Sequence, residues 1–157
     1  MSEEEYRRAL RHERKRGTLG GKAACEACGE TDIRTLQASG GKVLCADCRL
    51  ELSGSAPVEK NHPAGRRNDS FAVEMRANEH AVFSDMQNDW PPDTLRNPKR
   101  SPLLRLAASH RATRNTLLRQ AEVQLEQAEL IEDLEKFCRR KIGEDWCREF
   151  EVFRKGK

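Results

Sequence analysis

Two pairs of cysteines constrain the fold of this chain more than any other feature of its sequence. Cys25 and Cys28 form one Cys-x-x-Cys pair, and Cys45 and Cys48 form a second after an interval of sixteen residues. Each pair can occupy a tight turn that directs two thiolates at one ion, and two pairs complete the tetrahedral set that zinc prefers. Because four cysteines leave no open position for substrate or water, we predict a structural Zn²⁺ in a small zinc ribbon over residues 21–55. A redox role is the alternative for one such pair, but two pairs at this spacing favour a metal.

The composition favours small metal-stabilised modules over one large core. Apolar residues make up 36% of the 157 residues and aromatic residues only 5%, so the supply of core side chains is small. Modules of this kind usually need a metal or a partner. No apolar run is long enough to cross a bilayer and the N-terminus lacks a signal-peptide core, so we predict a cytoplasmic protein with no membrane partner. In a reducing compartment, paired cysteines are expected to be metal ligands rather than disulfides.

Positive charge is concentrated near the N-terminus. The net charge is only +3, but residues 7–16 carry six basic side chains against one acidic side chain. Ser2 and three glutamates come before them, an order that complements the dipole of a helix ending near Gly17. We predict a basic helical arm over residues 1–20 and expect four of its side chains to contact nucleic acid: Arg11, Arg14, Lys15 and Arg16.

The C-terminal region, residues 93–157, is predicted to be helical. Ser101-Pro102 opens a long amphipathic segment that reaches residue 142, and Pro102 suits a first helical turn. The apolar stripe drifts relative to a seven-residue repeat, which favours packing on the chain's own domain, a helical homodimer or a protein partner over a long coiled coil. A short terminal helix is expected after Gly143, and we interpret Cys138 and Cys147 as small apolar packing residues. The stripe comprises Leu117, Ala121, Leu125, Ala128, Ile131, Leu134 and Cys138.

The segment 56–92 combines short strands and turn residues with a helix. A strand is expected from Val58, followed by the loop PAGRRND, a second strand around Phe71–Met75 and a helix capped by Asn78. Pro91-Pro92 is expected to end this helix. The predicted fold class is therefore α+β, with a zinc ribbon, a ββα module, a long C-terminal helix and a short terminal helix.

The text PVEKNHPAGRRND, followed by NEHAVFSDMQNDWP, resembles the ββα-metal module of HNH-type endonucleases, in particular small HNH-like proteins with a zinc ribbon. The resemblance covers residues 56–92, or 23–92 with the ribbon. It implies that His62 is the general base that deprotonates the water attacking a phosphodiester. It also implies that His80 and the residue before the base, here Asn61, bind a second divalent ion such as Mg²⁺, Mn²⁺, Ni²⁺ or Zn²⁺.

Further positions follow from the same resemblance. A ligand often found one turn after the helix histidine would fall at Ser84, and Asp85 is the candidate that replaces it. Arg66 and Arg67 lie in the loop between the strands, where guanidinium groups can bind phosphates. Asn68 is a displaced candidate for the central asparagine of the motif.

The sequence leaves three functions open. The first is an HNH endonuclease-like protein that acts on or binds nucleic acid, with DNA as the foremost partner. The second is a catalytically inactive zinc-ribbon adaptor that binds nucleic acid or protein. Asn61 favours this second function, because it stands where His or Asp is usual and a neutral amide is a poorer metal ligand. The third is a structural or oligomerising protein that associates through residues 101–142.

Overall fold

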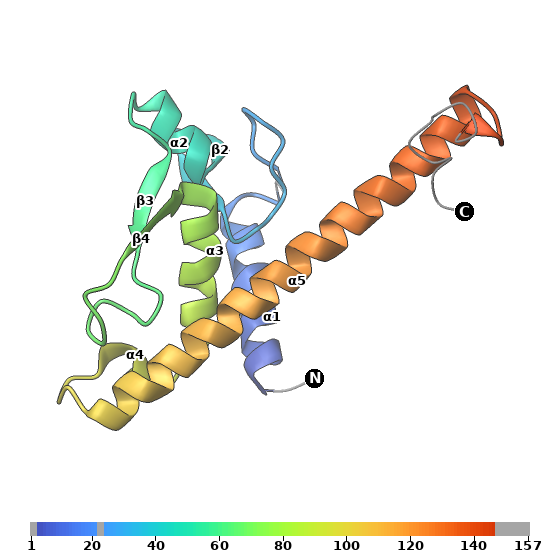
Figure 1. Cartoon of the computed structure of the whole chain (residues 1–157). Helices are drawn as coiled ribbons and strands as arrows, with labels where there is room; N and C mark the ends of the chain where they lie inside the picture. The colour runs from blue at the N-terminus through green and yellow to red at the C-terminus, as the bar shows by residue number, and fades with distance from the viewer. Residues whose placement is uncertain (1–2, 22–23, 147–157) are drawn as a thin grey trace, which may run out of the picture. The chain divides into compact units, whose positions relative to one another are not determined.

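The computed structural model describes residues 3–21 and 24–146 and shows a mixed fold of helices and two small antiparallel sheets (Figure 1). The chain divides into two units, residues 1–115 and 116–157, and the boundaries expected at residues 20, 55 and 92 all lie in the first. In chain order the elements are α1 (Glu3–Thr18), β1 (Leu36–Ser39), β2 (Lys42–Cys45), α2 (Ala46–Leu52), β3 (Val58–Asn61), β4 (Val73–Arg76), α3 (Ala77–Gln87), α4 (Pro92–Arg96) and α5 (Pro102–Lys141).

The first sheet is the hairpin of β1 and β2, which joins the two cysteine pairs. Ser39 pairs with Lys42 across a two-residue turn, and Gly40 and Gly41 have φ values of 57° and 79°. Left-handed backbone at both turn positions is the geometry that matches the twist of a hairpin, and glycine adopts it without strain. The core of this module contains three of the four cysteines, together with Leu19, Ile33, Leu36, Val43 and Leu44.

The two cysteine pairs lie on different kinds of structure. The first pair forms the predicted tight turn, in which the Gly29 N–H donates to the Cys25 carbonyl at 2.9 Å. For the second pair the prediction of a similar turn is wrong, because Cys45 ends β2 and Cys48 lies in the first turn of α2. The sulfur of Cys45 accepts a hydrogen bond from the Cys48 N–H at 3.5 Å and so takes the place of a helix cap.

The second sheet is the hairpin of β3 and β4, and α3 begins directly after β4. The sequence suggested that Asn78 caps its own helix, but the structure shows a different role. Its side-chain oxygen accepts from the Asp47 N–H of α2, while the Asp47 carboxylate accepts from the Asn78 N–H of α3, both at 3.0 Å. Each residue thus satisfies a free N–H in the first turn of the other's helix. This exchange joins the cysteine module to the ββα segment.

A second core lies where the β3–β4 loop meets α4 and the start of α5. Ala64, Trp90 and Ala108 are buried there, with Leu95 and Ala112 packed against them. Trp90 is only 4% exposed, so it is a packing residue, as expected from its place before the two prolines. This core holds the β3–β4 loop close to the segment that connects α4 with α5.

The long helix α5 begins at Pro102, as predicted, and ends at Lys141, one residue before the predicted end. Within their own unit, residues 116–157, Leu117, Leu125, Ile131 and Leu134 are all more than half exposed, so this unit does not bury the apolar stripe by itself. What packs on the stripe stays a prediction. Cys138 is partly buried, whereas Cys147 and most of the expected terminal helix lie outside the described residues. Every helix in the described ranges is too short or too polar to span a bilayer.

Candidate functional site

The four predicted cysteine ligands come together at one point. The sulfur atoms of Cys25, Cys28, Cys45 and Cys48 all lie within 4.8 Å of one another, and those of Cys28 and Cys45 are 3.7 Å apart. A tetrahedron with Zn–S distances of about 2.3 Å has edges of about 3.8 Å, so the spacing fits a zinc site with four cysteine ligands. Within residues 3–21 and 24–146 this is the only group of three or more His, Cys, Asp or Glu residues placed to share an ion.

The charges of this cysteine cluster also favour a cation. Burial raises the pKa of the Cys25 thiol, but the backbone N–H groups of Cys45, Cys28 and Ala27 outweigh it and lower that pKa to about 6. Burial and the neighbouring cysteines instead raise the pKa of Cys48. One thiol therefore ionises readily. The ionisation of a second thiol beside it is disfavoured by the low dielectric and by the like charge. A divalent ion supplies the charge that allows all four to ionise.

The three ligands expected for a second metal are engaged separately. The Nδ1 of His80 on α3 is hydrogen-bonded to Glu59 on β3, and Arg49 lies 3.8 Å from the same carboxylate. Asn61 is buried, with 2% of its surface exposed. Asp85 accepts from the Arg11 Nε at 2.9 Å and contacts the His12 Nε2 at 2.9 Å. No third carboxylate, histidine or cysteine of the described chain joins His80 and Glu59.

His62 lies directly after β3, at the start of the loop that carries the arginines. Its carbonyl accepts from the Gln87 Nε2 at 2.9 Å, and the same amide donates to the Pro63 carbonyl at 3.0 Å. These bonds attach the loop to the end of α3. The Nδ1 of His62 is buried and has no hydrogen-bond partner among the described residues.

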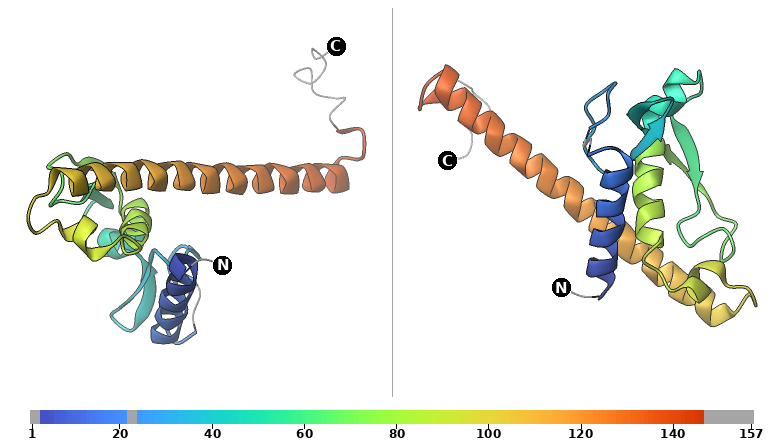
Figure 2. Two further views of the ribbon diagram at one scale, coloured as in Figure 1. Left: turned by 90° about the horizontal axis from the view of Figure 1, so that it is seen from below. Right: turned by 180° about the vertical axis from the view of Figure 1, so that it is seen from behind.

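Part of the basic arm is used within the protein. The views in Figures 1 and 2 show α1 running beside α3, and Arg11 binds both Asp85 and Asp89 there. Burial raises the pKa of Asp85, but its hydrogen bonds to Arg11 and His12 outweigh this and lower it. These contacts therefore stabilise the docked arm at neutral pH, and the contribution is lost as the pH falls through the pKa of Asp85.

The other predicted arm residues differ in their surroundings. Lys15 donates to the Arg34 carbonyl at 2.9 Å, and Arg16 lies 3.4 Å from Glu13 at an exposed site. Arg14 is exposed. Asp85 on α3 and Asp89 in the turn after it face Arg8 and Arg11 of α1. The spacing of these acidic and basic residues is the sequence signal that would have indicated the contact.

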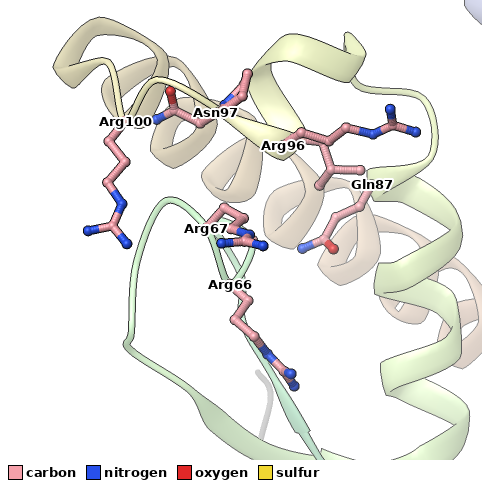
Figure 3. Close-up of a pocket in the computed structure, with 9 residues that line it drawn as sticks. Arg66, Arg67, Gln87, Arg96, Asn97 and Arg100 are labelled. Atoms are coloured by element: carbon pink, nitrogen blue, oxygen red, sulfur yellow. The ribbon is translucent and has the colours of Figure 1, made fainter.

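The β3–β4 loop and the α4–α5 segment enclose a pocket of about 550 Å³ (Figure 3). Arg66 and Arg67 of the loop and Arg96 and Arg100 of the facing segment line it, together with the apolar Leu95 and Pro98. In Figure 3 the side chains of Arg67 and Arg100 lie on the same side of the space, whereas those of Arg66 and Arg96 extend away from them. No carboxylate lines this arginine pocket, and none of the four guanidinium groups has a side-chain partner among the described residues. The sequence predicted Arg66 and Arg67, but missed Arg96 and Arg100, which carry no recognisable motif.

A buried asparagine network holds the two walls of the arginine pocket together. The Nδ2 of Asn68 donates to the carbonyls of Ala64 and Thr94, both at 2.9 Å. The Nδ2 of Asn97 donates to the Asn68 Oδ1 at 2.9 Å and to the Ser101 carbonyl at 3.1 Å. Asn68, expected as a motif residue, thus has a positioning role: it fixes the arginine-bearing loop against the segment that carries Arg96 and Arg100.

Comparisons with family models, curated proteins and solved structures gave no match for this chain.

Proposed function

We propose that this chain binds nucleic acid through the arginine pocket, on a scaffold stabilised by a structural zinc ion. The observation that carries the proposal is that four arginines, and no carboxylate, line one concave site. Arginine side chains placed near carboxylates are usually paired, as Arg11 is here. Guanidinium groups without internal partners remain available to bind phosphate oxygens in pairs, which is their preferred geometry.

The scaffold supports this assignment. The asparagine network and the Gln87 amide fix the loop that carries Arg66 and Arg67, so these side chains project from an ordered backbone. The reciprocal bonds of Asp47 and Asn78 connect that region to the cysteine cluster. A zinc ion in the cluster would have a structural role, because all four ligand positions are cysteines. DNA is the partner class that the resemblance to HNH proteins favours.

Replacing Arg67 and Arg100 together by glutamine is expected to weaken binding to a fluorescently labelled DNA duplex by at least about tenfold at low salt. Each lost phosphate contact should also reduce the slope of log K against log salt by about one. Fluorescence anisotropy over a salt series measures both quantities. Lys99→Gln is the matched control, because Lys99 is exposed, adjacent to Arg100 and outside the pocket lining. Affinity equal to wild type in the double variant would refute the proposal.

A second candidate function, hydrolysis of phosphodiesters, is favoured by the place of His62 at the start of the arginine-bearing loop, with no hydrogen-bond partner for its buried Nδ1 among the described residues. A neutral imidazole there would take a proton from water as the water oxygen attacks phosphorus and the strand oxygen leaves. A divalent ion, if bound beside His80, would stabilise charge on the leaving oxygen. The engagement of Asp85 by Arg11 and the pairing of His80 with Glu59 favour binding over cleavage.

Supercoiled plasmid incubated with Mg²⁺, Mn²⁺ or Ni²⁺ separates these two functions. If the protein is a nuclease, nicking should require the metal and disappear in His62→Ala, while affinity for DNA in the absence of metal stays unchanged. If it only binds, no metal produces nicking with wild-type protein. Agarose electrophoresis of the plasmid topoisomers gives the result directly.

A further inference from the structure

The shape of the arginine pocket differs from that of a surface that follows a nucleic-acid strand. Its volume of about 550 Å³ lies in the range of small-molecule sites. Its two walls are a loop and a helix connection that face each other (Figure 3), and the asparagine network joins them behind the arginines. Proteins that bind long strands usually have grooves lined with cations along the backbone path. A pocket with two walls instead suits the terminal group of a strand, which can enter between them.

The charge of the pocket also matches an end group. A phosphomonoester carries a charge of about −1.5 to −2 near neutral pH and three acceptor oxygens. An internal phosphodiester carries one charge and has two unbridged oxygens. Arg67 and Arg100 are fork-shaped donors, each able to make two parallel hydrogen bonds, and neither has a carboxylate partner among the described residues. Three terminal oxygens can use more of these hydrogen bonds than two oxygens can.

The backbone around the pocket is unusual in the same place. Asn97 and Arg100 have φ values of 36° and 52°, and they are the only residues other than glycine with positive φ in the described ranges. Asn97 is the left-handed C-cap of α4, a conformation that asparagine adopts readily, whereas at Arg100 left-handed backbone costs free energy. The bonds of Asn97 to Asn68 and Ser101 hold this cap in place, three residues before Arg100.

We propose that the arginine pocket binds the terminal phosphate of a nucleic-acid strand in preference to internal phosphodiesters, an inference that rests on the proposed function and specifies its ligand. The apolar lining of Leu95 and Pro98 lies beside the arginines, where the sugar or base of the terminal nucleotide would pack. Arg67 and Arg100 bind the phosphate oxygens.

Three labelled oligonucleotides of one sequence, with a 5′-phosphate, a 3′-phosphate or two hydroxyl ends, provide the test. Wild-type protein is expected to bind one phosphorylated strand about tenfold more tightly than the hydroxyl strand at equal salt, the effect of one added charge-assisted hydrogen bond. The preference should shrink at pH 5, where the monoester loses its second charge. A nucleoside 5′-monophosphate and inorganic phosphate, added separately, should compete with the phosphorylated strand and show whether the nucleoside contributes to binding.

The controls separate this inference from the proposed function. The Arg67→Gln/Arg100→Gln variant should lose the end preference, and Lys99→Gln should keep it. Equal affinity of wild-type protein for all three strands, with binding lost in the double variant, would overturn the inference and leave the proposed function intact. An end preference that persists in the double variant would overturn the inference, since the phosphate would then bind elsewhere. Absence of binding to every strand would overturn both. Competition on wild-type protein gives a result even if the double variant fails to fold.

Discussion

Removing the metal from the cysteine cluster should unfold the segment from residue 24 to residue 52. The segment consists of a two-stranded hairpin and the seven-residue helix α2, and neither is stable alone in water. Its core is small and includes three of the ligands. Structural zinc contributes about 10–16 kcal/mol of binding free energy in small zinc-binding peptides. We therefore expect chelation to lower the Tm of the protein by more than about 10 °C.

Circular dichroism during thermal unfolding, with and without a strong zinc chelator, measures this effect, and elemental analysis gives the metal content. Cys48→Ser should reproduce the loss in the presence of zinc, because it removes one ligand. Cys138→Ser is the matched control, since Cys138 lies outside the cluster. Because the cysteines must release their protons to bind zinc, zinc affinity should fall as the pH is lowered. A metal-free protein with an unchanged Tm would contradict the prediction.

Replacing Asn68 by alanine should destabilise the protein by about 3 kcal/mol. Asn68 is 4% exposed and makes hydrogen bonds to Ala64, Thr94 and Asn97. The substitution leaves two carbonyls and one amide N–H buried without partners, and each such group costs about 1–3 kcal/mol. The pocket walls should also separate, so affinity for DNA should fall although no arginine has changed.

Urea unfolding followed by tryptophan fluorescence reports the change in the free energy of unfolding. Asn88→Ala is the matched control: Asn88 is exposed at the end of α3, and the expected change is within about 0.5 kcal/mol. Asn97→Ala and the double variant complete a thermodynamic cycle. The double variant should lose less stability than the two single variants lose in total, because both single substitutions remove the same hydrogen bond. Equal stabilities of Asn68→Ala and Asn88→Ala would show that the asparagine network contributes little.

Features that depend on residue type and on short separations along the sequence were predictable. The cysteine cluster was predicted with all four ligands, because two short Cys-x-x-Cys intervals bring thiolates together through local turns whatever the rest of the chain does. The start of α5 was predicted correctly because Pro102 and the three- and four-residue apolar spacing are local properties of a helix. The partner of its apolar stripe was not predictable, because amphipathicity shows that a face needs a partner but not which partner provides it.

The candidate site depends on pairs of residues far apart in the sequence. Arg96 and Arg100 join Arg66 and Arg67 only because Asn97 meets Asn68 across twenty-nine positions. By itself, the sequence determined the four clustered cysteines, the α+β fold class and the long helix, since local spacing specifies them. Only the tertiary structure decided which arginines remain available for a ligand: Asp85 and Asp89 bind Arg11, whereas no carboxylate lines the arginine pocket. The physical reason is that charge pairing depends on distance in space, and a basic residue has the same letter whether or not a carboxylate lies beside it.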